Sequence, residues 1–568
     1  MIALRLISSL EKVFPDEPLS CSEFTAFSAL RGERLSFQVA YTLCGLEYRK
    51  LKAEWDSDLP AEAQFHEVGC VPAMFPAFRN RHDEDYLRLT AGLYPDILLP
   101  YPGYVEAVGD QWRSLWCTLT IPENANGDYT FTITLYDRDH PETEYAACTG
   151  TVHVIPVQMP RQELIFSQWF HCDCLAEHYN VPVFSEDFWP LLERYLENAV
   201  RSGMTMLLTP IFTPPLDTAV GGERPTTQLV GVRWNGTAYS FDFSLLERFI
   251  KLAQKKGIRY FEMAHLFTQW GAAAAPKVMA ETETGPRRIF GWDTPSDSPE
   301  YVDFLRQFLP VLKNCLKELG VLDHTVFHLS DEPSQEHMEN YLRAAEGVKD
   351  LLADCYVTDA LSNYEYYRDG LVPHPVPSTN HIEPFLAGHV KDLWTYYCCG
   401  QCMEVGNRFL AMPSYRNRIL GLQLYKFNIR GFLQWGYNFW FRQYSLGKID
   451  PFRVTDAGNA WPAGDPFSVY PGDDGCPIAS LRQEVFYDAL QDMRALKCLE
   501  QWLTQQEIQE IVEEDCEEPL TFRAYPRNSQ WLLQARERIN KRIEWEAFHG
   551  DADDRASQGS HSPKKDRI

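Results

Sequence analysis

The chain has 568 residues and a formal net charge of −26, and 45% of its residues are hydrophobic and 13% aromatic. This length exceeds one ordinary domain, so we expect a large unit and at least one accessory domain. The negative charge argues against nucleic acid and anionic membrane surfaces as partners, because both attract an excess of Lys and Arg.

Residues 1–158 are the first predicted domain. Apolar and polar residues alternate at 35–41, 114–121 and 129–136, which is typical of half-buried antiparallel strands. Asn126-Gly127-Asp128 supplies a tight turn before the last of these runs. The pattern predicts an N-terminal β-sandwich that ends in a linker containing two prolines.

Residues 159–506 have a different rhythm, in which short apolar runs alternate with longer segments of helical pattern. This alternation indicates βα units around a parallel sheet. Eight such units predict the α/β fold class and, within it, a (β/α)8 TIM-like barrel with insertions. The eight predicted strands lie at 164–170, 205–209, 260–267, 325–330, 354–360, 372–379, 393–399 and 432–440.

Three further segments accompany the predicted barrel. Residues 226–243 contain Trp234-Asn235-Gly236 and predict a hairpin inserted after the second strand. Residues 507–549 are a predicted C-terminal extension, consisting of a strand or loop and a charged helix. Residues 550–568 are polar, and we expect them to form a disordered tail.

The fourth predicted strand runs directly into two acids and a proline, Asp331-Glu332-Pro333. In barrel enzymes the catalytic groups stand at the carboxyl ends of the strands, where the loops build a pocket around a rigid rim. The same residue types also favour the N-terminus of a helix, so helix capping is an alternative interpretation. We predict that Asp331 and Glu332 are catalytic.

Glycoside hydrolysis is one reaction that uses such carboxyls, and conventional retention requires a second carboxyl about 5–5.5 Å from the acid. In common barrels of this kind the second carboxyl ends the seventh strand. Here that strand, 393–399, contains no acid, and Glu383 and Glu404 lie outside it. Substrate assistance needs no protein nucleophile. In that mechanism a 2-acetamido group attacks the anomeric carbon, and two neighbouring carboxyls assist it.

The chain resembles glycoside hydrolase family 123, the β-N-acetylgalactosaminidases. Three segments in order carry the resemblance, and they are Ser167-Gln168-Trp169-Phe170-His171-Cys172-Asp173-Cys174, Ser330-Asp331-Glu332-Pro333 and Leu433-Gln434-Trp435-Gly436-Tyr437-Asn438-Phe439-Trp440. It covers about residues 1–500. The resemblance implies that Asp331 orients the 2-acetamido group and that Glu332 is the general acid/base.

Other strand ends supply candidate sugar contacts. They are His171 and Asp173 at the first strand, His265 and Trp270 near the third, Tyr396 or Tyr397 at the seventh, and Trp435, Asn438 and Trp440 at the eighth. Sugar C–H faces stack on aromatic rings, and related substrate-assisted enzymes use a tyrosine hydroxyl on the acetamido oxygen. Because neighbouring strand residues point to opposite faces, we expect one tyrosine to face the pocket. Core roles are the alternative for the histidines and tryptophans.

Fifteen cysteines, including Cys398-Cys399, are typical of free thiols in a reducing compartment. His171-Cys172-x-Cys174 and Cys398-Cys399-x-x-Cys402 offer soft ligands for zinc, but their spacing does not match familiar zinc motifs. We therefore predict buried reduced cysteines, no metal and no cofactor. The first residues lack a signal-peptide pattern and no apolar run approaches ~18 residues, so we expect a soluble, cytoplasmic protein.

These features together predict a retaining β-N-acetylhexosaminidase that uses substrate assistance and releases N-acetylgalactosamine or a related hexosamine. Its predicted partner is a β-linked N-acetylhexosaminide, with no nucleic acid and no membrane. One alternative is a conventional glycosidase acting on a sugar without the acetamido group. Another is a carbohydrate-binding protein without turnover. No oligomeric state is predicted.

Overall fold

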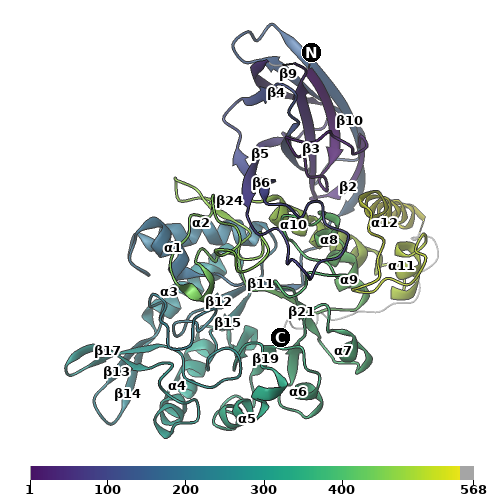
Figure 1. Ribbon diagram of the computed structural model, residues 1–568. Helices are drawn as coiled ribbons and strands as arrows, with labels where there is room; N and C mark the ends of the chain where they lie inside the picture. Colours follow the sequence, from purple (N-terminus) through teal and green to yellow (C-terminus); the bar gives the residue numbers. More distant parts are fainter. Residues whose placement is uncertain (1, 46, 550–568) are drawn as a thin grey trace.

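The computed structural model describes residues 2–45 and 47–549, and a strand-rich N-terminal part stands on a larger mixed α/β part (Figure 1). The N-terminal part contains two five-stranded sheets, ordered β1-β3-β8-β5-β6 and β2-β10-β9-β4-β7. The strands are β1 (Ile2–Ser8), β2 (Ala26–Arg31), β3 (Arg34–Leu43), β4 (Tyr48–Ser57), β5 (Gln64–Ala73), β6 (Gly92–Pro100), β7 (Val105–Val108), β8 (Arg113–Thr120), β9 (Gly127–Asp137) and β10 (Glu144–Gln158).

The two N-terminal sheets share one hydrophobic core. Phe37 of β3 stacks on Phe131 of β9 with ring centroids 5.2 Å apart, and Trp55 of β4 stacks on the same ring at 4.8 Å. Alternate residues of each strand point inward, which is why the sequence alternates between apolar and polar residues. The pairing is antiparallel except between β2 and β10, which run parallel.

Eight short parallel strands form the centre of the larger part. One sheet has the order β11-β22-β21 and the other the order β12-β15-β18-β19-β20. The strands are β11 (Ile165–Gln168), β12 (Met206–Thr209), β15 (Tyr260–Met263), β18 (Thr325–His328), β19 (Tyr356–Ala360), β20 (His374–Val376), β21 (Trp394–Tyr396) and β22 (Gly431–Gln434). Each overlaps one of the eight predicted strands, so the mixed α/β prediction is confirmed.

The predicted single closed sheet is replaced by a five-stranded and a three-stranded sheet, and the interruptions between them have local causes. Beside β20, Pro375 and Pro377 lack an amide donor, and one isolated bridge joins Ser378 to Tyr396. Beside β11, the amide of Phe166 donates to the Thr205 hydroxyl instead of to a backbone carbonyl (2.9 Å). The ladder is therefore interrupted at both edges.

Helices alternate with these strands, as the sequence pattern predicts. They are α1 (Cys172–Tyr179), α2 (Phe188–Arg201), α3 (Ser244–Lys256), α4 (Pro299–Glu318), α5 (Met338–Glu346), α6 (Glu365–Arg368), α7 (Glu383–Ala387), α8 (Tyr415–Arg418) and α9 (Leu420–Lys426). Local signals set their ends. Ser298 caps α4 by accepting from the Tyr301 amide, and Gly257 ends α3 with a φ of 110°, which favours glycine.

The insertions form a second, smaller sheet with the order β14-β13-β16-β17. Its strands are β13 (Gly231–Trp234), β14 (Tyr239–Asp242), β16 (Val278–Thr282) and β17 (Gly285–Phe290). The hairpin expected within 226–243 is its antiparallel β13-β14 pair. A two-stranded sheet of β23 (Tyr470–Pro471) and β24 (Pro477–Ile478) follows the last parallel strand.

Three C-terminal helices connect the two parts of the molecule. They are α10 (Leu481–Leu499), α11 (Gln505–Val512) and α12 (Ser529–His549), and Figure 1 shows α12 beside β2 and β10. Arg536 of α12 donates to Asp492 of α10 (2.8 Å) and to Glu33 of the N-terminal part (2.7 Å). The predicted tail, 550–568, lies outside the described residues. No helix in the described ranges is long and apolar enough to span a bilayer.

Candidate active site

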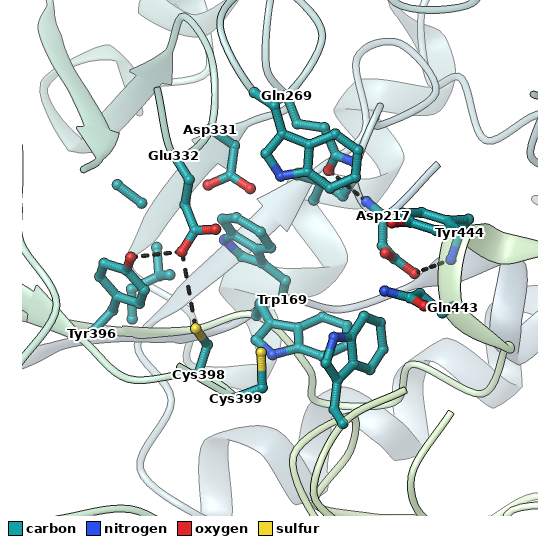
Figure 2. A pocket seen from close by; sticks show the side chains of 16 residues that line it. Trp169, Asp217, Gln269, Asp331, Glu332, Tyr396, Cys398, Cys399, Gln443 and Tyr444 are labelled. Carbon is teal, nitrogen blue, oxygen red and sulfur yellow. Dashed lines mark hydrogen bonds between the residues drawn. The ribbon is translucent and has the colours of Figure 1, made fainter. Parts of the chain in front are cut away.

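A cavity of about 230 Å³ lies at the carboxyl ends of the parallel strands (Figure 2). Its wall includes the last residues of β19 and β21 and the loops that follow β11, β12, β15, β18 and β22. The lining residues are Trp169, Leu216, Asp217, Gln269, Trp270, Asp331, Glu332, Ala360, Tyr396, Cys398, Cys399, Leu433, Trp435, Gln443, Tyr444 and Trp461. The cavity is where a parallel α/β fold places its chemistry.

Asp331 and Glu332 follow β18 and both reach this wall. The Asp331 carbonyl accepts the Trp270 amide (2.8 Å), and the Glu332 amide donates to the Ala360 carbonyl (2.9 Å). Glu332 has a φ of 44°, a left-handed conformation that costs a residue with a side chain roughly 1–2 kcal/mol. Such strain is held where surrounding contacts over-determine the backbone, and it clusters at functional sites.

Helix capping does not account for the pair. Ser334 caps the next turn, because its side chain and the His337 side chain form a reciprocal capping box. Helix α5 begins only at Met338. Asp331 and Glu332 therefore lie before the cap, with their side chains on the cavity wall.

The pair is half-buried in the cavity wall, and its partial removal from water sets its protonation. Burial raises the pKa of Asp331 well above its usual value, and the charge of Glu332 raises it further. Burial also raises the pKa of Glu332, against the opposing effect of hydrogen bonds from Tyr396 and Cys398. Two adjacent carboxyls that resist ionising together retain a proton near neutral pH. The site can therefore act as a general acid.

Tyr396 and Cys398 approach one oxygen of the acid. The Tyr396 hydroxyl donates to Glu332 Oε1 at 2.6 Å, and Cys398 Sγ lies 3.9 Å from the same oxygen. Figure 2 shows both side chains pointing toward Glu332. These contacts fix Oε1 of the carboxyl in the cavity wall.

A buried network behind the pair holds its backbone. Asp359 Oδ1 accepts the amides of Leu329 (2.9 Å) and Ser330 (3.1 Å). His328 Nε2 lies 2.6 Å from Glu262. Burial lowers the pKa of His328, but the nearby carboxyls of Asp359, 3.5 Å from Nδ1, and of Glu262 outweigh this effect and raise it to about 10. An imidazolium between two carboxylates therefore supports the strand end.

Aromatic side chains form much of the remaining wall. Trp169 donates its indole N–H to Glu262 (2.8 Å), and Trp435 donates its own to Asp465 (3.0 Å). Trp461 packs edge-on against Trp435 with ring centroids 4.8 Å apart. Each ring is held in one orientation, which suits stacking against the C–H face of a sugar.

The opposite side of the cavity is built from loops. Asp217 follows β12 and accepts the Tyr444 amide at Oδ2 (2.7 Å), and its own amide donates to Gln269 Oε1 (2.6 Å). Asp217 and Tyr444 have left-handed φ values of 39° and 60°. Burial raises the pKa of Asp217 to about 6, although the Tyr444 amide and Arg224 oppose this.

The family model for the glycoside hydrolase 123 catalytic domain matches residues 169–499. The chain belongs to glycoside hydrolase family 123. A family 123 glycoside hydrolase from Clostridium perfringens, whose structure was described for glycolipid glycan hydrolysis, superposes with a TM-score of 0.72 at 16% identity. The match covers 96% of this chain and 98% of that one, and it shows the fold.

A β-glucuronidase from Parabacteroides merdae gives a TM-score of 0.29 at 10% identity, over 87% of this chain and 52% of that one. A search of curated proteins found no match.

Five of the predicted site residues line the cavity of this family 123 protein, namely Asp331, Glu332, Trp270, Tyr396 and Trp435. The choice between the two tyrosines is resolved by the side-chain alternation of β21. Tyr396 faces the cavity, whereas Tyr397 is buried on the other side and donates to Asn417 (3.1 Å).

The other residues predicted to contact the sugar lie behind the cavity wall. Each of them is hydrogen-bonded, ion-paired or packed against other side chains there. Asn438 Oδ1 accepts the His171 amide (2.8 Å), Asp173 forms a buried ion pair with Arg224 (2.8 Å), and Trp440 donates to the Val469 carbonyl (3.2 Å). His265 stacks on His328 with centroids 4.5 Å apart. We therefore assign no direct sugar contact to His171, Asp173, His265, Tyr397, Asn438 or Trp440.

The cysteines do not assemble a metal site. In the described residues no group of three or more His, Cys, Asp or Glu side chains has the geometry to hold a metal ion. All fifteen cysteines are free, and burial raises the pKa of Cys172 and of Cys174 well above the usual thiol value. These two are therefore neutral thiols, and Cys398 and Cys399 belong to the cavity wall.

The sequence predictions omitted several wall residues. Gln269 adjoins Trp270, and Trp169 lies two residues before His171, so their positions near strand ends carried a signal. Asp217, Gln443, Tyr444 and Trp461 come from long loops, and no strand period places them. Tertiary contacts bring them to the cavity, such as the hydrogen bond from the Tyr444 amide to Asp217 and the packing of Trp461 on Trp435.

Proposed function

We propose that this protein is a retaining β-N-acetylhexosaminidase, with β-linked N-acetylgalactosamine as its preferred sugar, and that the substrate's own acetamido group is the nucleophile. The observation that carries the proposal is the pair of adjacent, half-buried carboxyls, Asp331 and Glu332, on the wall of one aromatic cavity. Their raised pKa values keep one proton on the pair at neutral pH, and in the proposed mechanism Glu332 carries that proton while Asp331 is ionised. Their adjacency provides one group for the leaving oxygen and one for the amide.

In the first step Glu332 donates its proton to the glycosidic oxygen while the acetamido oxygen attacks the anomeric carbon. The C1–O bond breaks, the alcohol leaves, and an oxazolinium ion forms. Asp331 accepts the amide N–H and balances the positive charge. In the second step Glu332 removes a proton from water as the water attacks C1 and opens the ring. Two inversions give retention.

Tyr396 has a different proposed role from the one expected. Its hydroxyl donates to Glu332 Oε1 at 2.6 Å, so we assign it to positioning the acid rather than to holding the acetamido oxygen. By stabilising the carboxylate form it moderates the pKa that burial raises.

The main rival is a conventional retaining glycosidase with a protein nucleophile. Glu383 and Glu404 do not line the cavity, and both pair with Arg523. The remaining carboxyl on the wall is Asp217, which is engaged by the Tyr444 amide. If Asp217 were the nucleophile, azide would rescue Asp217→Ala by forming a glycosyl azide, and substrate assistance predicts no such rescue.

The proposal also includes the architecture of the catalytic part and the cellular location of the protein. We propose that the two parallel sheets act as one (β/α)8-like barrel, since the Thr379 amide donates to the Tyr396 carbonyl (2.9 Å) and the Thr205 amide to the Phe166 carbonyl (3.0 Å) across the two interruptions. We also propose a cytoplasmic location, which the fifteen free thiols support. Fractionation of cells that produce the native protein tests the location.

The test of the activity compares 4-nitrophenyl β-glycosides of N-acetylgalactosamine, N-acetylglucosamine, galactose and glucose. We expect turnover of the acetamido sugars only, faster on the galacto isomer, and competitive inhibition by a thiazoline that mimics the oxazolinium ion. Turnover of the sugars without an acetamido group, unaffected by the thiazoline, would support the conventional rival. Binding of the sugars without turnover of any would support a carbohydrate-binding protein.

A further inference from the structure

The cavity wall across from Tyr396 carries a carboxylate and an amide that the proposed mechanism does not use. Asp217 and Gln269 are adjacent there, joined by the 2.6 Å hydrogen bond from the Asp217 amide to Gln269 Oε1. Figure 2 shows this bond on the side of the cavity away from Glu332 and Tyr396. The two residues come from loops that follow different strands.

Gln269 presents a buried donor without a partner. Its side chain is only 4% exposed, and Oε1 is fixed by the Asp217 amide, which defines the orientation of the NH2 group. In the described residues Nε2 has no hydrogen-bond partner. A buried polar group left unpaired is costly, and Gln269 is part of the cavity wall, so a ligand oxygen packed against this wall would satisfy Nε2.

Asp217 is fixed by hydrogen bonds to its carboxylate, to its own carbonyl and to the carbonyl of the preceding residue. Tyr444 donates its amide to Oδ2 (2.7 Å), and the Ser445 hydroxyl donates to the Asp217 carbonyl (2.8 Å). Arg224 holds the preceding carbonyl, that of Leu216, at 2.7 Å. An ionised carboxylate offers about four acceptor positions, so these contacts leave Asp217 able to accept hydrogen bonds from the cavity.

We propose that Asp217 and Gln269 together recognise a hydroxyl on the C4–C6 edge of the sugar. A hydroxyl donates one hydrogen bond and accepts others, and it satisfies both groups by donating to the carboxylate and accepting from Nε2. The assignment to this edge rests on the proposed function, which places C1 and C2 at Glu332 and Asp331. The C4–C6 edge of a pyranose is then the edge that faces the opposite wall.

The test is a cycle of variants against deoxy substrates. Asp217→Asn and Gln269→Met each keep the side-chain size, and each is assayed on the 4-nitrophenyl glycoside that the wild type cleaves best and on its 4-deoxy and 6-deoxy analogues. With the parent substrate we expect kcat/KM to fall roughly 10- to 100-fold in each variant. With the deoxy analogue that lacks the recognised hydroxyl, variant and wild type should agree within about twofold.

Thermal melting of each variant monitors the fold, and Asp139→Asn is the matched charge control because Asp139 lies exposed in the N-terminal part. An equal fractional loss on the parent and on both deoxy substrates would overturn the proposal, since the residues would then act only on loop structure. The acetamido requirement is read separately, from the wild type on 2-acetamido and 2-hydroxy substrates. Failure of the proposed function therefore leaves the deoxy cycle interpretable on whichever sugar is cleaved.

Discussion

The two sides of the cavity are built in different ways. The side with Asp331 and Glu332 stands at a strand end and is held by a buried network, in which Asp359 accepts two backbone amides. The side with Asp217 and Gln269 stands on loops that hold one another. Strand ends fix chemistry that every substrate requires, whereas loops can change to recognise a particular sugar. This difference agrees with the proposal that catalysis belongs to the first side and specificity to the second.

The largest expected effect is a loss of activity on the side of the cavity that carries Asp331 and Glu332. Glu332→Gln removes the proton donor, and we expect kcat/KM on 4-nitrophenyl substrates to fall roughly 10²- to 10⁴-fold. Dinitrophenyl glycosides need little protonation on departure, so their glycosylation step should be much less impaired. Asp331→Asn, in contrast, should slow both substrate classes alike. Steady-state assays of the two variants with both leaving groups give the comparison.

Equal losses for Glu332→Gln on both leaving groups would contradict its role as the acid. Circular dichroism of the two variants serves as the control for folding.

The next largest effect is expected at the buried ion pair of Asp173 and Arg224, which lies behind the side of the cavity that carries Asp217 and Gln269. Arg224→Met leaves Asp173 buried without its partner, and breaking a buried pair of this kind costs about 3–5 kcal/mol of unfolding free energy. Denaturant unfolding measures the loss. The double variant Asp173→Leu/Arg224→Met removes both charges and should recover much of the stability. No recovery would show that Arg224 acts mainly through the Leu216 carbonyl.

A smaller effect is expected at the aromatic wall. Trp435→Phe removes the indole N–H that donates to Asp465 (3.0 Å) and reduces the stacking face. We expect KM to rise roughly tenfold with little change in kcat, since stacking and one hydrogen bond together contribute about 1–2 kcal/mol. A fall in kcat with unchanged KM would instead assign Trp435 to the transition state.

The smallest expected effect is a shift in pH dependence. In the proposed mechanism activity requires protonated Glu332 and is lost as the pH rises through its pKa, which burial raises and the Tyr396 hydrogen bond lowers. Tyr396→Phe removes the lowering contact, so the basic limb of kcat/KM should move to higher pH, by up to about one unit. A limb that stays in place or moves to lower pH would show that Tyr396 does not act through this carboxyl.

Local sequence pattern was sufficient to predict the strands and the acids. Apolar runs located all eight parallel strands, and the Asp331-Glu332 motif at the end of one of them predicted the two carboxyls on the wall. Their positions follow from strand period and chain direction, which are local properties.

Tertiary contacts decided the rest. His171 and Asp173 carry chemistry-bearing side chains at a strand end, yet Asn438 and Arg224 hold them behind the wall. Asp217 reaches the cavity because Tyr444, more than two hundred residues later, adopts a left-handed turn and donates to it. No periodic pattern encodes a contact between two loops, so the loop-borne side required the structure.

The most direct test of the central claim varies the nucleophile within the substrate. Aryl β-glycosides of galactosamine with N-acetyl, N-fluoroacetyl, N-difluoroacetyl and N-trifluoroacetyl groups differ mainly in the electron density of the amide oxygen. If Asp331 and Glu332 serve an attacking acetamido group, kcat/KM falls steeply with each added fluorine. A rate that is independent of fluorination would contradict the account.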